Sequence, residues 1–157
     1  MLRSGPSILL GMMVGMSTLS GGAALAEVAE CDPATMNCSP LVVCVEATGE
    51  ILRGASFGLD AGPFAAASTS GVICEGSWRR GFLGIGLAEF ACSDGRSGTS
   101  AFTWFEPESG TAVGSGRFST GEEARFWAGN NLERYFREVA PEERQRMACS
   151  PGDMLLS

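Results

Sequence analysis

The chain has 157 residues, enough for one domain, and its 18 acidic residues outnumber 11 basic ones, giving a net charge of −7. Such an acidic chain is a poor candidate for binding nucleic acid, because contacts to phosphate need clustered positive charge. The chain contains no histidine, which excludes Ser-His-Asp and Cys-His catalytic arrangements.

Residues 1–26 have the three parts of a cleavable secretory signal peptide. Arg3 supplies the positive charge, residues 8–19 form an apolar run, and small residues end at Ala26, which places the cut before Glu27. An uncleaved membrane anchor is the alternative, but the apolar run is shorter than the ~20 residues that span a bilayer. We therefore expect a periplasmic or secreted protein with no stable membrane span after cleavage.

The cysteines predict a disulfide framework, because an even number in a short exported chain is typical of one. No CxxC pair or histidine is present to bind a metal, so we expect neither a metal site nor a cofactor. Cys74 is expected to pair with Cys92 across a hairpin, and Cys149 with one of the three N-terminal cysteines. The six residues are Cys31, Cys38, Cys44, Cys74, Cys92 and Cys149.

After a polar N-terminal arm (residues 27–40), the pattern predicts one β-rich domain over residues 41–157. Residues 58–71 are small and show no period, which indicates a loop, and the sequence does not say whether it is ordered. Short runs rich in β-branched and aromatic residues, separated by glycine turns, predict strands. These runs are residues 41–46, 51–57, 72–78, 83–92, 98–105, 111–118 and 123–127.

The last part of the chain changes period. Leu132, Tyr135, Phe136 and Val139 recur on one face of a helix over about residues 130–139. The fold class expected is therefore mainly β: a small antiparallel meander, hairpin stack or partial barrel, stapled by disulfides, with a C-terminal helix.

A glycine pattern over residues 74–95 is more specific than composition. It resembles the MORN repeat, with a cysteine where the family usually has an aromatic residue, and weaker echoes flank it. The resemblance implies stacked β-hairpins and favours a protein- or surface-binding role. The stretch from Cys92 to Phe118, with Cys-Ser-Asp-Gly-Arg-x-Gly and a later Gly-x-Gly, also resembles small exported bacterial proteins of unknown function. The matching residues are Cys74, Gly76, Trp78, Gly81, Gly84, Gly86, Asp94 and Gly95.

The candidate ligand-binding residues are Trp78, Trp104 and Trp127, which lie on predicted strands. Strict alternation would place Phe102 and Trp104 on one face of their strand and Phe105 on the other. Aromatic residues on both faces fit either core packing or an exposed strip for a glycan or a protein.

Paired carboxylates offer the remaining route to catalysis. Glu106 and Glu108 flank a proline, and Glu89 and Asp94 lie near a hairpin. A glycosidase needs two such acids facing each other across a cleft, whereas solvated surface is the ordinary role of such residues. We assign no catalytic residue.

These observations favour a non-catalytic exported domain that binds a protein or a cell-envelope component. A carboxylate-dependent hydrolase acting on envelope polysaccharide is one alternative, and a structural unit that self-assembles through its edge strands is another. A hydrolase requires converging acids, and a binding module requires an exposed aromatic or apolar patch.

The intact mass of the protein tests both the cleavage of the signal peptide and the formation of the disulfides. We expect the protein recovered from an oxidising compartment to begin at Glu27 and to show six alkylatable thiols only after reduction. Thiols that react before reduction would contradict the framework, and an uncleaved mass would indicate a membrane anchor.

Overall fold

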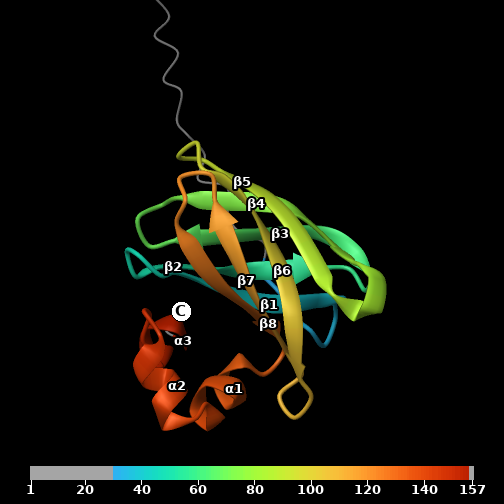
Figure 1. Ribbon diagram of the computed structural model, residues 1–157. Helices are drawn as coiled ribbons and strands as arrows, with labels where there is room; N and C mark the ends of the chain where they lie inside the picture. The colour runs from blue at the N-terminus through green and yellow to red at the C-terminus, as the bar shows by residue number, and fades with distance from the viewer. Residues whose placement is uncertain (1–29, 156–157) are drawn as a thin grey trace, which may run out of the picture.

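The computed structural model describes residues 30–155, which form an eight-stranded antiparallel barrel with three short α-helices on one side (Figure 1). Each strand pairs with the next along the chain, and β8 pairs with β1 to close the ring. The strands are β1 (Cys38–Val45), β2 (Glu50–Phe57), β3 (Ala61–Ser68), β4 (Ile73–Arg80), β5 (Gly86–Cys92), β6 (Ser97–Glu106), β7 (Thr111–Phe118) and β8 (Glu123–Gly129). The helices are η1 (Phe82–Gly84, a 3-10 turn), α1 (Leu132–Glu138), α2 (Pro141–Arg146) and α3 (Pro151–Leu155).

The mainly β fold, the meander order and the C-terminal helix are confirmed, but the loop expected at residues 58–71 is wrong. This segment contains β3, which pairs with β2 on one side and β4 on the other. Its alanines and serines have little intrinsic preference for strands. Pairing on both sides fixes the strand, and Phe64, Ala66 and Ser68 alternate into the interior.

The predicted signal peptide lies outside the described residues. The arm ends sooner than expected, since β1 begins at Cys38. Within residues 30–155, no helix combines the length and the apolar character needed to cross a membrane.

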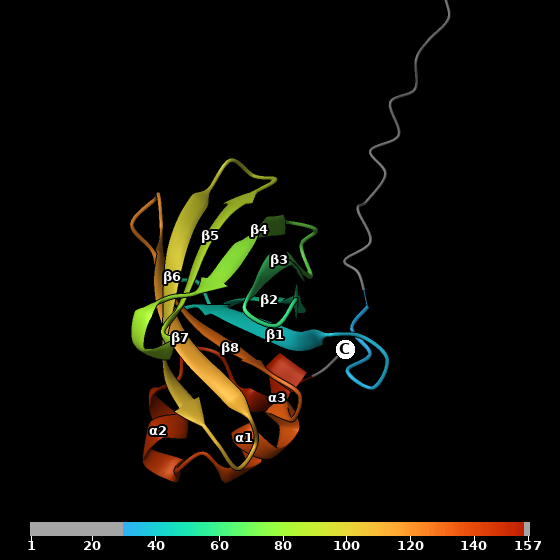
Figure 2. The same cartoon turned by 90° about the vertical axis from the view of Figure 1, so that its right-hand side faces the viewer.

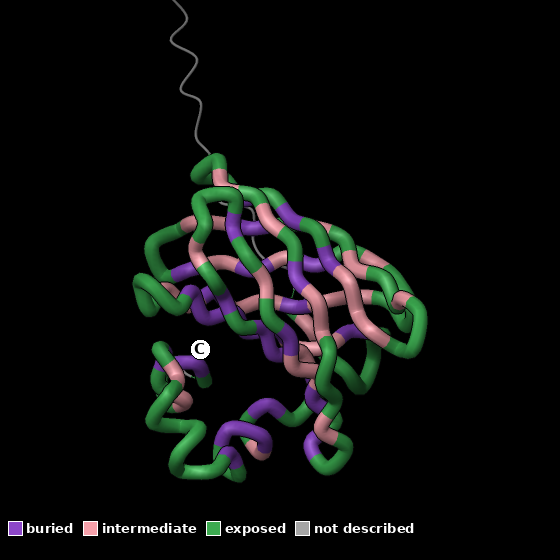
Figure 3. Tube along the Cα trace, viewed as in Figure 1, coloured by how far each residue is buried: buried purple, intermediate pink, exposed green. Residues whose placement is uncertain are grey.

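Strand β1 is buried on both faces, which explains its uninterrupted apolar sequence. Leu41, Val43 and Val45 point into the barrel and belong to the interior cluster. Val42 and Cys44 point outward and pack beneath the C-terminal helices with Trp127 of β8. In Figure 3 the buried segments accordingly lie in the barrel wall and on the helices facing β1 and β8.

The helices follow from capping and periodicity. The Asn131 side chain accepts a hydrogen bond from the backbone N–H of Arg134 at 3.2 Å and begins α1, close to the expected helix start. Pro141 begins α2 at a position where its missing N–H costs nothing. The Phe136 ring packs edge-on against Trp127 with centroids 5.3 Å apart, so α1 covers the outer face of β8.

Three disulfides are present, and they include both pairings expected from the sequence. Cys74 of β4 bonds to Cys92 of β5, its direct cross-strand neighbour. Cys44 of β1 bonds to Cys149, which ties the segment between α2 and α3 to the barrel wall. Cys31 bonds to Cys38 and holds the arm.

The barrel interior is packed by rings that alternate with glycines across neighbouring strands. Phe90 of β5 lies between Gly76 of β4 and Gly98 of β6. A Cβ atom at Gly98 would lie 2.6 Å from the Phe90 Cζ and 2.5 Å from the Arg117 carbonyl oxygen. These glycines are therefore required by space, because any side chain would displace the ring that fills the barrel.

A single added methyl group tests this packing. We expect Gly98→Ala to lower the free energy of unfolding by about 2 kcal/mol, because the interior is overpacked. Gly152→Ala in α3 is the matched control and should change it by less than ~0.5 kcal/mol, because its added Cβ would meet only a serine hydroxyl at 3.6 Å. Urea unfolding followed by circular dichroism measures both, and equal effects would contradict the account.

Candidate functional site

The two ends of the barrel are built differently. At one end the turns β1–β2, β3–β4, β5–β6 and β7–β8 close over a cluster of phenylalanines. Phe90 lies at its centre, with ring centroids 5.1 Å from Phe118, 5.9 Å from Phe126 and 6.3 Å from Phe64. We call this the closed end. Its rings leave the opposite end as the accessible part of the interior.

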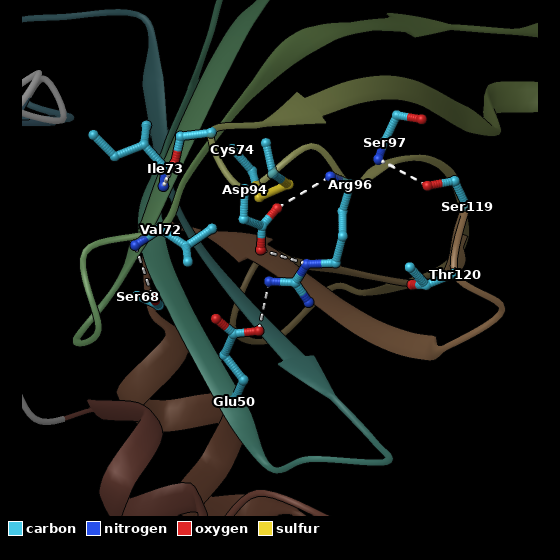
Figure 4. Close-up of a disulfide and its surroundings, with 12 residues drawn as sticks. Glu50, Ser68, Val72, Ile73, Cys74, Asp94, Arg96, Ser97, Ser119 and Thr120 are labelled. Carbon is cyan, nitrogen blue, oxygen red and sulfur yellow. Dashed lines mark hydrogen bonds and ion pairs between the residues drawn. A yellow bond between two sulfur atoms is a disulfide. The ribbon is translucent and has the colours of Figure 1, made fainter.

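Arg96 seals the closed end (Figure 4). Its guanidinium donates to Asp94 Oδ2 at 2.7 Å and to Glu50 Oε2 at 2.8 Å, and Glu122 lies 3.7 Å away. It also lies over the Phe118 ring, 4.7 Å from the centroid, and its side chain is 14 % exposed. Partial burial by itself would raise the pKa of Asp94, but hydrogen bonds and charge attraction from Arg96 bring it below its ordinary value of 3.8.

A cavity of about 640 Å³ occupies the opposite end, which we call the open end. The loops β2–β3, β4–β5 and β6–β7 surround it, at the side of the barrel that faces the viewer in Figure 2. Phe64, Phe102 and Phe126 line its inner part, and Leu59 and Phe105 line its rim. The lining is mainly apolar, and Arg80 is its one charged residue among those described.

The structure separates the three candidate tryptophans. Trp78 and Trp104 both line the cavity, whereas Trp127 faces outward beneath α1 and is 1 % exposed. The indole N–H of Trp78 donates to the Phe57 carbonyl oxygen at 2.8 Å, which fixes the half-buried ring in the cavity wall. Trp104, at 62 % exposed, is the tryptophan that solvent reaches most.

The expected alternation along β6 is wrong, because the register shifts between Phe102 and Trp104. Phe102 pairs with Gly114 on the interior face, but Trp104 pairs with Val113, which packs beneath the helices. Phe105 pairs with Ala112, which lines the cavity, and at this end of β6 both Trp104 and Phe105 reach the rim of the cavity. An extra residue in one strand reverses the faces of everything beyond it, and no local signal in the sequence marks it.

Ser100 is a polar residue at the cavity that the sequence pattern did not identify as a candidate. Its side chain is buried on β6 at the cavity wall. Its hydroxyl is the one buried side-chain polar atom among the described residues with no hydrogen-bond partner. An unpaired buried hydroxyl costs about 1–3 kcal/mol, so Ser100 is a polar group at the cavity wall that is available for a hydrogen bond.

The loop β4–β5 also differs from expectation. The strand predicted over residues 83–92 begins only at Gly86, because residues 82–84 form η1 at the rim. Phe82 and Leu83 are 88 % and 84 % exposed at its tip. Two large apolar residues between glycines, in the run Gly81-Phe82-Leu83-Gly84, are the signal that could have identified an apolar tip from the sequence.

The candidate carboxylates lie outside the cavity lining. Glu106 accepts hydrogen bonds from the Ser109 hydroxyl and from the backbone N–H groups of Glu108 and Ser109, and these bonds lower its pKa. Glu108 forms an ion pair with Arg134 at 2.9 Å. Both acids therefore stabilise the β6–β7 turn.

Asp94 is held by Arg96 at the closed end, and Glu89 lies exposed on β5. Within residues 30–155, no group of three or more potential metal-ligating side chains comes together.

No protein-family model and no curated protein sequence matches this chain, so the resemblance to MORN repeats rests on residues 74–95 alone. Two designed barrels are similar in structure. One is a redesigned β-barrel, mFAP1, bound to DFHBI, with 10% identity and a TM-score of 0.47 over 60% of this chain and 93% of that one. The other is a de novo designed fluorescence-activating β-barrel, with 16% identity and a TM-score of 0.46 over 60% of this chain and 92% of that one. At these scores the likeness carries no conclusion about a ligand.

The seal at the closed end predicts a stability effect. We expect Arg96→Leu to lower the free energy of unfolding at pH 7 by about 2 kcal/mol, because Asp94 and Glu50 lose their partner in a half-buried site. Arg117→Leu, which breaks only an exposed pair with Glu123, is the control and should cost less than ~0.5 kcal/mol.

The stability lost in Arg96→Leu should also depend on pH. The pKa of Asp94 is lowered in the folded protein, so its stabilising contribution is complete above an unfolded-state pKa of about 4. The contribution is lost as the pH falls through the lower folded-state pKa. The difference between wild type and Arg96→Leu should therefore shrink below about pH 4 in urea unfolding, and a pH-independent difference would contradict this origin.

Proposed function

We propose that this protein is an exported, non-catalytic binding protein that holds a small, mainly apolar molecule of the cell envelope in the open end of its barrel. The observation that carries the proposal is the cavity of about 640 Å³, closed at one end and open at the other. This volume lies within the ~300–1,000 Å³ of typical small-molecule sites. Eight strands form the smallest common barrel that can hold one small ligand.

The chemistry of the cavity wall favours a ring-containing or hydrocarbon ligand. Phe64, Phe102 and Phe126 present apolar surface, and the Trp78 ring is held in place by its own hydrogen bond. A rigid aromatic wall binds with little loss of conformational entropy. The unpaired Ser100 hydroxyl supplies one polar group in the inner wall, which a rotation about χ1 would turn toward a ligand hydroxyl or carbonyl.

The disulfides support export. Three bonds join all six cysteines, and such bonds persist in oxidising compartments. A periplasmic or secreted location would bring the cavity into contact with envelope components, which include many hydrocarbon-containing molecules.

The other hypotheses find less support. A hydrolase would need acids converging in the cavity, and the described lining contains none. Self-assembly through edge strands would need an unpaired edge, whereas each of the eight described strands pairs on both sides.

The cavity can be tested by filling it. The uncharged fluorescent probe N-phenyl-1-naphthylamine should bind the mature protein saturably with one molecule per chain. Ala112, which lines the cavity on β7, can be replaced by tryptophan. We expect Ala112→Trp to weaken probe binding by about tenfold or more in a fluorescence titration.

Ala101→Trp is the matched control, because Ala101 pairs with Leu87 and Ser115 on the outer face of the barrel. It should leave probe affinity within about twofold of wild type. Equal affinities for wild type and Ala112→Trp, or binding that never saturates, would refute the cavity as the ligand site. Thermal unfolding of both variants shows that each is folded.

A further inference from the structure

Large apolar side chains that reach solvent gather around the open end. Of the seven such residues among those described, five lie on the three loops and hairpin ends at this end of the barrel, and the other two are Met36 and Leu155. We call these five the apolar collar: Leu59, Phe82, Leu83, Trp104 and Phe105. Four of them also line the cavity, so the collar and the cavity wall share residues.

Leu83 is held in the collar against its local preference. It has a φ of 61°, and it is the one residue other than glycine with a positive φ among those described. A leucine in this left-handed conformation costs about 1–2 kcal/mol, which glycine would avoid. An exposed, strained leucine lowers the stability of the fold, and such exceptions to local rules concentrate at functional sites.

The shape of the collar favours a fluid partner. Its side chains come from three separate loops and hairpin ends around the opening of the cavity. Lipid headgroups and acyl chains are fluid and adapt to side chains that project separately. Trp and Phe are also the side chains suited to the boundary between water and hydrocarbon.

The distribution of charge points the same way. At the open end Arg80 pairs with Asp60 at 3.2 Å and Arg134 pairs with Glu108 at 2.9 Å, which balances these charges. Near the closed end five acids outnumber the three arginines that pair with them: Glu46, Glu50, Asp94, Glu122 and Glu123 against Arg96, Arg117 and Arg125. The excess of negative charge thus lies at the end away from the collar, while the charges beside the collar are paired.

We propose that the apolar collar docks on the surface of a phospholipid bilayer, with its side chains in the interfacial region and the cavity opening toward the acyl chains. The collar would then give an apolar molecule a path between bilayer and barrel that avoids water. This inference goes beyond cavity binding, because docking requires the collar residues and not an occupied cavity.

The exposed Trp104 provides the readout. Mature protein is mixed with unilamellar phosphatidylcholine vesicles, with and without bromine on the acyl chains. Docking should shift tryptophan emission to shorter wavelength, and brominated chains should quench it. Trp104→Phe should remove most of the shift and quenching while the protein still cosediments with vesicles, because Trp127 is buried and Trp78 is half-buried.

The decisive variant is Phe82→Ser with Leu83→Gly. It should lower vesicle partitioning by about tenfold or more, because it removes two apolar side chains from the interface. Its thermal midpoint should equal or exceed that of wild type, because glycine suits the positive φ at position 83. Leu155→Ser, on α3, is the control for an exposed leucine outside the collar and should bind as wild type does.

Two results would overturn the proposal. The first is absence of partitioning, or partitioning that the loop variant leaves unchanged. The second is a concentration-dependent mass without lipid that the loop variant abolishes, which would make the collar a self-association surface. Ala112→Trp should still dock on vesicles although it binds the probe weakly. The experiments therefore distinguish a failure of the proposed ligand binding in the cavity from a failure of the proposed docking by the collar.

Discussion

An eight-stranded barrel has an interior just wide enough for side chains to fill, and in this protein a cluster of phenylalanines around Phe90 fills the closed end. Phe90 can occupy the axis only because Gly76 and Gly98, its neighbours on either side, have no side chains. The same alternation recurs toward the open end, where Phe102 pairs with Gly114, which in turn pairs with Phe126. Core, strand register and the glycine-rich composition therefore depend on one steric requirement.

That requirement also separates the two ends. Once rings and the Arg96 cluster close one end, the remaining volume can only open at the other, where small residues such as Ala112 and Ala128 line the wall. The C-terminal helices α1, α2 and α3 contribute no residue to the cavity lining, because they lie against the outer face of β1 and β8. The packed core and the accessible cavity thus lie in different parts of one small barrel, and the exposed apolar residues at the rim take no part in the packing around Phe90.

The sequence predicts what local chemistry determines. Turn glycines and β-branched runs identify seven strands, and the cysteine count and spacing anticipate three disulfides. It does not reveal β3, because alanine and serine become a strand only through the neighbours on both sides. The sequence also gives no sign of the bulge near Thr103, and the prediction therefore placed Trp104 and Phe105 on the wrong faces of β6. The sequence also could not place the candidate tryptophans, because only the closed ring of strands shows that Trp78 and Trp127 lie on opposite sides of the wall.

The pairing of β1 with β8 has a consequence for how the chain assembles. Neighbouring strands can pair in chain order as hairpins. The closing pair of β1 with β8 cannot form until residues 123–129 are in place, and the Cys44–Cys149 bond spans 105 residues. Contacts between such distant segments form slowly. Until they form, the growing sheet exposes two unpaired borders and its phenylalanines, which makes this interval the one in which the chain is most open to misassociation. Once the β1–β8 pair and the Cys44–Cys149 bond have formed, they oppose unfolding, because the barrel can open there only if the first and last strands separate.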